Sequence, residues 1–350
     1  MSNEKVNISE LFEKSKLFAY TEISEPPICL TIQNTEHNSI FGTLGNFSVI
    51  TGRAKSRKTF FVSAIVGATL LNKEYLRIKP TFPENKKRVL YIDTEQSYFH
   101  AKKVLSRISK ICNLNENEHH ENLIFCCLRG NNGAKMTEII EFALKQYTDI
   151  GLLIIDGVKD LVTSINDERE ATATTTNLMK WSANYNVHII TVLHKNKNDE
   201  NLRGHLGSEM INKAESVLAI TKSQDISTIE SVIMRDLDIE KYNFGISENN
   251  IPYETEILIK ENSTKKKLEP KQINKEIHQE VLIKVFEKKK IFSYGELVEE
   301  IQTALKTFGY EYGNTKCKDF LTFYKENKYI SELDTKKDEK YYLSINEIPF

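Results

Sequence analysis

Between residues 26 and 260, short apolar runs alternate with longer stretches in which apolar residues recur every three or four positions. The short runs are rich in β-branched and aromatic residues and end at turn-forming residues, which is typical of strands. They lie at residues 47–51, 88–92, 123–127, 152–155, 187–193, 216–220 and 231–234. Strands that alternate with helices indicate β-α-β units, and continuously apolar strands indicate helices on both faces. The pattern predicts an α/β domain with a mostly parallel sheet.

The composition changes near residue 260. Residues 261–272 (ENSTKKKLEPKQ) are polar, rich in lysine and contain a proline, which predicts a solvated linker. The first residues, 1–25, contain a short amphipathic stretch, ISELFEKSKLF, that predicts an N-terminal arm. We therefore expect an arm at 1–25, a domain at 26–260, a linker at 261–272 and a second domain at 273–350.

The second domain shows three helical patterns followed by two strand-like runs. The first helical pattern covers 273–289, the second begins after Ser293, and the third begins at Asn314 or Thr315. The strand-like runs cover 328–332 and 341–345. Ser293 is a candidate N-cap because Glu296 stands in the capping-box position. This order resembles a winged helix-turn-helix, and the resemblance is architectural, since no residue signature accompanies it. It implies a small winged-helix-like α+β domain that binds DNA or another protein, and the sequence leaves that choice open.

The charges of the chain nearly cancel. Its 350 residues carry 48 basic and 49 acidic side chains, a formal net charge of −1, so a nucleic-acid surface has to be local. No apolar run reaches the roughly 18 to 20 residues that span a bilayer, and Glu4, Glu10 and Glu13 interrupt the place of a signal peptide's apolar core. The five cysteines lack the C-x-x-C spacing of a zinc site. We expect a cytoplasmic protein with reduced thiols and no membrane partner.

The first strand-like run ends in GRAKSRKT, residues 52–59, and a helical pattern follows at once. A strand, such a loop and a helix are the context of a phosphate-binding loop, whose backbone N–H groups surround the phosphates of a nucleotide. Lys58 supplies a point charge and Thr59 a hydroxyl for Mg²⁺, so we expect ATP and Mg²⁺ as cofactors. The expected nucleotide-binding residues are Gly52, Arg53, Ala54, Lys55, Ser56, Arg57, Lys58 and Thr59.

Arg57 stands where the pattern G-x-x-x-x-G-K-[ST] has its second glycine. That position usually requires a positive φ, which costs a non-glycine residue on the order of 1 kcal/mol. In one interpretation the guanidinium contacts a phosphate and offsets the strain. In the other, the loop has drifted and binds nucleotide weakly or not at all. The intact lysine and threonine at the strand-to-helix junction favour retained binding.

Three later strand-like runs end in polar residues. Asp93 and Glu95 follow the run at 88–92, Asp156 follows the run at 152–155, and His194 follows the run at 187–193. Carboxyl ends of parallel strands share one edge of a sheet, where α/β folds bind ligands. At that edge Asp156 can complete the Mg²⁺ site opposite Thr59, and Glu95 can orient and polarise an attacking water. Singly, each acid is more simply a helix N-cap or a solvated loop residue, but their joint order resembles the RecA-like ATPase superfamily.

Within that superfamily, residues 168–253 look like the carboxyl half of the RepA-type and DnaB-type replicative helicase ATPases, and the whole resemblance covers residues 26–253. By position it implies that His194 is a sensor of the nucleotide state, that residues 195–204 form a loop in a central channel, and that Arg235 serves a neighbouring subunit's nucleotide. The alternatives are a packed histidine, a solvated loop and a surface arginine, since VIMRDLD lacks the K-x-R pair of DnaB-type enzymes. The expected catalytic residues are Lys58, Glu95, Asp156, His194 and Arg235.

The resemblance implies an ATPase that acts on DNA as a homo-oligomer, such as a hexameric ring, in the replication of a plasmid, phage or mobile element. Its expected partners are single-stranded DNA and replication or mobilisation proteins. The main alternative is an ATP-gated DNA-binding or assembly factor, such as a loader, recombination mediator or regulator, with little turnover. A motor requires turnover that single-stranded DNA stimulates, whereas a switch requires ATP affinity and ATP-dependent assembly.

Overall fold

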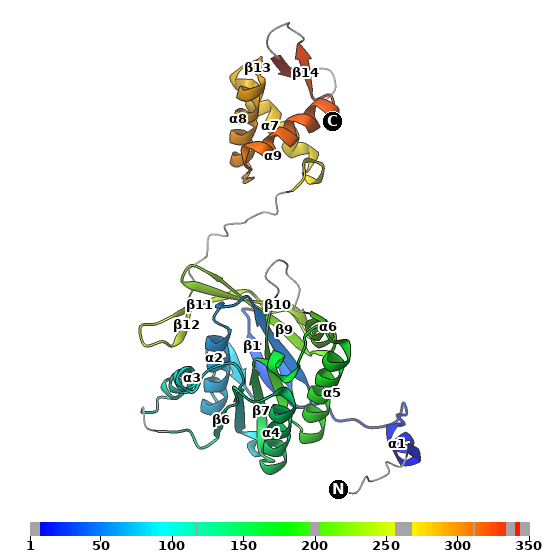
Figure 1. The fold of residues 1–350 in the computed structure, drawn as a ribbon, viewed down its shortest axis with the longest axis vertical. Helices are drawn as coiled ribbons and strands as arrows, with labels where there is room; N and C mark the ends of the chain where they lie inside the picture. Colours follow the sequence, from blue (N-terminus) through cyan, green and yellow to red (C-terminus); the bar gives the residue numbers. More distant parts are fainter. Residues whose placement is uncertain are drawn as a thin grey trace. The chain divides into compact units, whose positions relative to one another are not determined.

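A computed structural model describes residues 8–115, 118–195, 204–255, 268–310, 312–333 and 340–343 of the chain. The chain forms two compact units, Met1–Ile259 and Lys260–Phe350 (Figure 1). Most of the predicted linker at 261–272 lies outside the described residues. No helix in the described part of the chain is long and apolar enough to cross a membrane.

The first unit is built on a nine-stranded sheet with the order β12-β11-β10-β9-β3-β8-β7-β5-β6. The six strands from β9 to β6 run parallel to one another. They are β3 (Phe47–Gly52), β5 (Arg88–Asp93), β6 (Leu123–Cys127), β7 (Ile150–Asp156), β8 (His188–His194) and β9 (Ser216–Ser223). The seventh predicted strand is β10 (Ile226–Met234), which runs antiparallel to β9. The expected α/β fold with a mostly parallel, RecA-like sheet is confirmed.

Helices cover both faces of this sheet (Figure 1). On one face lie α2 (Lys58–Leu71) and α3 (Tyr98–Ile111), and on the other lie α4 (Gly133–Gln146), α5 (Glu168–Tyr185) and α6 (Gly204–Lys213). Strand β7 shows how one run serves both layers: Leu152 and Ile154 pack on the α2 side, and Leu153 and Ile155 pack on the α5 side. All four are fully buried, which explains the continuous apolar run in the sequence.

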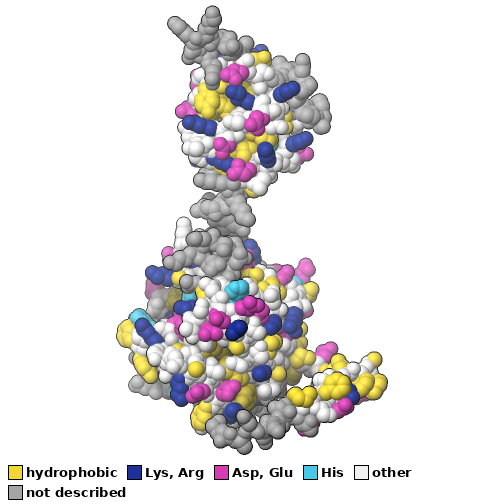
Figure 2. All heavy atoms as spheres, turned by 45° about the vertical axis from the view of Figure 1, so that its right-hand side comes forward, with side chains coloured by type: hydrophobic (Ala, Val, Ile, Leu, Met, Phe, Trp, Pro, Cys, Tyr) yellow, Lys and Arg dark blue, Asp and Glu magenta, His cyan; other side chains and the backbone are white. Residues whose placement is uncertain are grey.

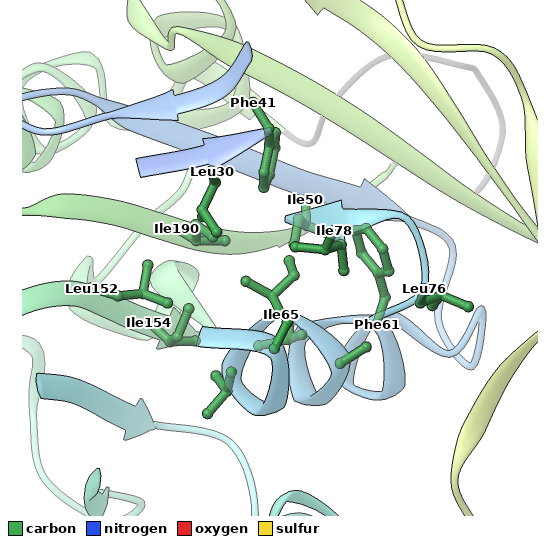
Figure 3. Packing of buried hydrophobic residues seen from close by; sticks show 14 of the residues in the cluster. Leu30, Phe41, Ile50, Phe61, Ile65, Leu76, Ile78, Leu152, Ile154 and Ile190 are labelled. Carbon is green, nitrogen blue, oxygen red and sulfur yellow. The ribbon is translucent and has the colours of Figure 1, made fainter. Parts of the chain in front are cut away.

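Figure 3 shows the layer on the α2 side, where Phe61 and Ile65 of α2 lie against residues of the central sheet. A second, antiparallel sheet adds Leu30 and Ile78 to this layer. Its strands, in the order β2-β1-β4, are β1 (Ile28–Gln33), β2 (Asn38–Thr43) and β4 (Ile78–Pro80). The sequence pattern did not predict this sheet, because β4 is three residues long and pairs with a strand more than forty residues earlier in the chain. It also missed β11 (Tyr242–Ile246) and β12 (Pro252–Thr255), which are short strands at the sheet edge.

The parallel register brings several strand ends to one edge of the central sheet. Asp93, at the end of β5, is in register with Asp156, at the end of β7. Gly52, at the end of β3, is in register with His194, at the end of β8. Loops at the carboxyl edge of such a sheet commonly form the ligand site of an α/β fold.

The second unit has three helices and a small antiparallel sheet. The helices are α7 (Lys275–Lys288), α8 (Tyr294–Thr307) and α9 (Asn314–Glu326), and the sheet has the order β13-β15-β14, formed by Phe292–Ser293, Lys340–Leu343 and Ile330–Leu333. Each helix gives its apolar face to one core, with Val281, Ile301 and Phe320 fully buried. Ser293 caps α8 in a capping box with Glu296, as predicted. The unit is therefore a small α+β structure with the predicted order of helices and hairpin.

The N-terminal arm contains α1 (Ile8–Ser15), in which no residue is buried. Its apolar residues Ile8, Leu11 and Phe12 are exposed, and hydrophobic side chains gather on this arm in Figure 2. A helix of eight residues is only marginally stable in water unless it packs on another surface.

Candidate active site

The loop between β3 and α2 occupies the carboxyl edge of the central sheet. It leaves β3 at Gly52, where a Cβ atom would lie 2.2 Å from the carbonyl oxygen of Ile220, so only glycine fits this close approach. Before α2 begins, Lys55 and Arg57 adopt positive φ values of 65° and 74°. Strand, loop and helix thus have the connection of a phosphate-binding loop.

Lys58 is buried at the base of this loop, with 5% of its surface exposed. Its Nζ donates to the carbonyl oxygens of Gly52, at 3.1 Å, and Arg53, at 2.9 Å, and lies 3.0 Å from Nδ1 of His194. Burial lowers the pKa of Lys58 to about 8, although the Asp156 and Glu95 carboxylates oppose that shift. The ammonium group has neutral partners only, which an anion can replace favourably.

Thr59 and Asp156 meet across the loop. Oγ1 of Thr59 donates to Oδ2 of Asp156 over 3.1 Å, and the buried Tyr91 donates its hydroxyl to the same oxygen over 2.8 Å. Burial raises the pKa of Asp156, and these two hydrogen bonds oppose the rise. A hydroxyl and a carboxylate so placed fit Mg²⁺, which commonly takes one or two protein oxygens and completes its shell with waters and phosphates. No group of three His, Cys, Asp or Glu side chains forms a metal cage within the described ranges.

Glu95 and His194 face each other beside Lys58. Oε2 of Glu95 lies 3.6 Å from Nε2 of His194. Because an ammonium group can only donate, Nδ1 of His194 accepts from Lys58, and Nε2 carries the proton that faces Glu95. The contact with His194 holds the pKa of Glu95 below its usual range. Glu95 is therefore ionised at neutral pH and remains accessible to water.

Asp93 shapes the turn that presents Glu95. It is fully buried, and its Oδ1 accepts the backbone N–H groups of Glu95, at 3.2 Å, and Gln96, at 2.8 Å. Its Oδ2 has no hydrogen-bond partner among the described residues. Burial raises the pKa of Asp93 to about 6. The two acids that the sequence placed at this edge thus differ: Asp93 points into the protein, and Glu95 lines the cavity.

Arg57 adopts the left-handed conformation expected at the position of the missing glycine. Its Nη1 donates to the carbonyl oxygen of Asp225, at 2.6 Å, in the turn between β9 and β10. The loop has not drifted, because Lys58 and Thr59 remain at the sheet edge with the contacts given above. The side chain of Arg57 therefore ties the loop to the β9–β10 turn, an arrangement that neither interpretation of the sequence included.

The site residues line one cavity of about 410 Å³. Its lysine and arginine side chains are Lys55, Arg57 and Lys58 from the loop and Lys103 and Arg107 from α3, and its acidic side chains are Glu95 and Asp156. This excess of positive charge suits a polyanion. Buried Ser56 also lines the cavity, and its Oγ has no hydrogen-bond partner among the described residues.

Tyr91, Lys103 and Arg107 were not predicted from the sequence as site residues. Tyr91 is one apolar residue within a strand run, and nothing local shows that its hydroxyl meets Asp156. Lys103 and Arg107 are four residues apart on α3, a spacing that places two side chains on one helix face. That spacing could have indicated a shared cationic face on α3. Only the packing of α3 beside α2 shows that this face borders the phosphate-binding loop.

Other predicted residues lie away from the cavity. Arg53 and Ala54 are exposed and do not line it. Arg235 follows β10 at the opposite edge of the sheet, where Met234 pairs with Ser216 at the start of β9. Of the predicted channel loop at 195–204, residues 196–203 lie outside the described residues.

We expect Arg57→Ala to destabilise the first unit more than Arg57→Gly. Both variants lose the hydrogen bond to Asp225, but glycine also relieves the left-handed strain, worth about 1 kcal/mol. Trp181, the only tryptophan, lies in α5, so its fluorescence during urea unfolding reports on the first unit. Asp225→Ala keeps the carbonyl acceptor and removes only an exposed carboxylate 3.7 Å from Nη2 of Arg57, so this matched control should change the midpoint little. Equal midpoints for the two Arg57 variants would show that the backbone is unstrained there.

Comparison with known proteins agrees with this geometry. Residues 38–200 match the model of a protein family described as AAA domain. The match includes the loop at 52–59 together with Glu95, Asp156 and His194, and it excludes Arg235 and the second unit. No curated protein matches the chain. The family match and the site geometry together support an ATP-binding P-loop ATPase of the AAA type in the first unit.

Proposed function

We propose that this chain is an ATP-hydrolysing, RecA-like protein that acts on DNA as a homo-oligomer, nearest to the RepA-type and DnaB-type helicase ATPases. The observation that carries hydrolysis is the chain of contacts from Lys58 through His194 to Glu95, beside the pair of Thr59 and Asp156. It combines a phosphate-binding cation, a water-orienting carboxylate and two oxygens for Mg²⁺ in one cavity. These are the parts that phosphoryl transfer to water requires.

Each side chain has a distinct task in this reaction. Lys58 exchanges its carbonyl partners for phosphate oxygens. Glu95 accepts a hydrogen bond from the attacking water and orients it. Thr59 and Asp156 would hold Mg²⁺, which when bound would neutralise part of the phosphate charge. Tyr91 fixes the orientation of the Asp156 carboxylate through its hydrogen bond to Oδ2.

The contact between Lys58 and His194 supports the sensor role of His194. When Lys58 turns to a phosphate, Nδ1 of His194 loses its donor. The imidazole is then free to rotate, and its contact with Glu95 depends on whether the loop is occupied. His194 thus links the phosphate state to the carboxylate that orients water.

Two surface features support assembly with further copies of the chain. The exposed apolar residues of α1 need a covering surface, as argued above. Arg235 lies at the sheet edge opposite its own cavity, beside exposed Val232 and Leu237, so it can serve only the nucleotide of another copy. A neighbour's arginine of this kind stabilises the charge of the transition state.

The role in DNA replication rests on the resemblance. On the face drawn in Figure 2, acidic and basic side chains of the described residues are mixed and form no continuous basic patch. On α9 of the second unit, Lys316 pairs with Glu269 at 2.6 Å, and Lys325 pairs with Glu332 at 2.8 Å. These two ion pairs reduce the local positive charge of α9, which is compatible with the second candidate function, an ATP-gated assembly factor with little turnover.

The two functions are separated by measuring Mg·ATP turnover with and without single-stranded DNA. The measurement covers the protein concentrations over which light scattering shows assembly. Turnover that rises with both assembly and DNA supports the motor. Tight binding with negligible turnover under every condition supports the assembly factor and contradicts the proposed motor.

We expect Glu95→Gln to bind ATP like the wild type and to lose turnover by about 10²- to 10⁴-fold, since the amide cannot act as a base. Glu138→Gln, on the exposed face of α4, should change neither quantity. Binding is measured by calorimetry and turnover by phosphate release. Unchanged turnover in Glu95→Gln would remove this residue from the mechanism.

Nucleotide affinity should fall as the pH rises above about 8. The free protein has a Lys58 pKa of about 8 because of burial, and only the charged form attracts phosphate. A bound phosphate raises that pKa, so affinity is level below pH 8 and falls about tenfold per pH unit above it. Glu95 does not gain or lose charge in this range, because its contact with His194 holds its pKa below the usual range. Calorimetric titrations from pH 7.5 to 9.5 measure the slope, and a flat profile would contradict the assignment.

A further inference from the structure

Arg107 is partly buried without an acidic partner. Its Nη1 donates to Oγ of Ser63 over 3.1 Å, and its Nε donates to the carbonyl oxygen of Asn250 over 3.2 Å. Its guanidinium carbon lies 3.5 Å from the centroid of the Phe60 ring. Neutral partners replace only part of the hydration that a cation loses on burial. Arg107 nevertheless stays charged at neutral pH, because burial lowers its pKa only to about 10.

Other partly buried arginines of the first unit have carboxylate partners. Arg77 pairs with Glu254 at 2.6 Å, and Arg88 pairs with Asp149 at 2.9 Å. Among the described residues, no carboxylate forms such an ion pair with Arg107. Arg107 is thus a partly buried guanidinium without an ion pair among the described residues; the Asp156 carboxylate only opposes the lowering of its pKa, and the group remains available for an anion that is not part of the chain.

The position of Arg107 indicates which external anion its guanidinium would bind. Arg107 lines the same cavity as Lys58 and Thr59. Ser63, its hydroxyl partner, lies one helical turn after Thr59 and donates to the carbonyl oxygen of Thr59 over 2.7 Å. Phe60, on which the guanidinium stacks, is the residue after Thr59. The guanidinium thus lies beside the start of α2, where a phosphate-binding loop holds its ligand.

The side chain is also oriented before any ligand binds. A guanidinium has five N–H donors, and the contacts with Ser63 and Asn250 use two of them, so the remaining donors are available to the cavity. Lys103, one turn earlier on α3, has an exposed side chain, and its ammonium lies 4.6 Å from the centroid of the exposed Phe99 ring, which does not line the cavity. A fixed guanidinium binds phosphate oxygens more specifically than a flexible ammonium group.

We propose that Arg107 is a second cationic ligand of the nucleotide's phosphate chain, which it contacts from α3 while Lys58 contacts it from the loop. The proposal rests on the nucleotide-binding function proposed above. It makes α3 part of the binding site and gives the polyphosphate two cations on separate elements. Arg107 then favours the charged polyphosphate over an uncharged nucleoside.

The test compares four forms of the full chain: wild type, Arg107→Gln, Arg107→Lys and Lys58→Ala. Glutamine places its amide nitrogen where Nε of Arg107 lies, so it can keep the hydrogen bond to the carbonyl oxygen of Asn250 but loses the contact with Ser63 and the charge. For each of the four forms we would measure the affinity for a fluorescent ATP analogue directly and the affinity for inorganic tripolyphosphate by competition. Arg169→Ala, an exposed arginine on α5, is the matched control. Trp181 fluorescence gives the thermal midpoint of the first unit for every variant.

We expect Arg107→Gln to weaken both ligands by about tenfold or more, the usual scale for a lost charge-assisted hydrogen bond. Arg107→Lys should recover part of that loss, and the thermal midpoints without ligand should stay equal. Wild-type affinity in Arg107→Gln, with Lys58→Ala unable to bind, would overturn this proposal alone. The proposal would also be overturned if Arg107→Gln lost affinity for ATP but not for tripolyphosphate, or if its loss of affinity accompanied a lower thermal midpoint. Normal binding by Lys58→Ala would instead overturn the nucleotide-binding function itself.

Discussion

The site depends on one buried ammonium group. Lys58 is almost completely removed from water at the end of the central strand, and its partners are two carbonyl oxygens and one imidazole nitrogen. Desolvation outweighs the attraction of the nearby Asp156 and Glu95 carboxylates and makes the charged form costly, so a directly bound anion stabilises Lys58 more than it would stabilise an exposed lysine. The sheet supports this arrangement because its parallel register places Gly52 beside His194. The same contact links the cation to Glu95, the residue proposed to orient water.

Around this cation, the loops are held by polar contacts that do not use the ligand. Asp93 fixes the turn before Glu95, Tyr91 fixes Asp156, and Arg57 joins the phosphate-binding loop to the β9–β10 turn. Orientation before binding reduces the entropy that is lost when a ligand binds. Arg57 shows how one residue can replace a glycine: it accepts the left-handed conformation, and its side chain finds a partner outside the loop.

Much of this structure follows from local patterns in the sequence. The seven strand runs, the loop at 52–59 and the strand ends at Glu95, Asp156 and His194 were all identified, because a buried parallel strand leaves a continuous apolar run and a polar end. What was missed depends on distant packing. Strand β4 pairs with β1 across the chain, and Arg107 borders the cavity only because α3 lies beside α2. The contact of Arg57 with Asp225 could not be predicted either, because the β9–β10 turn lies more than 160 residues later in the chain.

The central claim is that the cavity around Lys58 binds Mg·ATP. The most direct measurement is calorimetric titration of Mg·ATP into the full chain and into Lys58→Ala, with Trp181 fluorescence as the check that the first unit remains folded. The account predicts saturable binding to the wild type and an affinity at least about a hundredfold lower in the variant, since phosphate loses its buried cation. Equal affinities in two folded proteins would contradict it and would place the nucleotide elsewhere or nowhere on this chain.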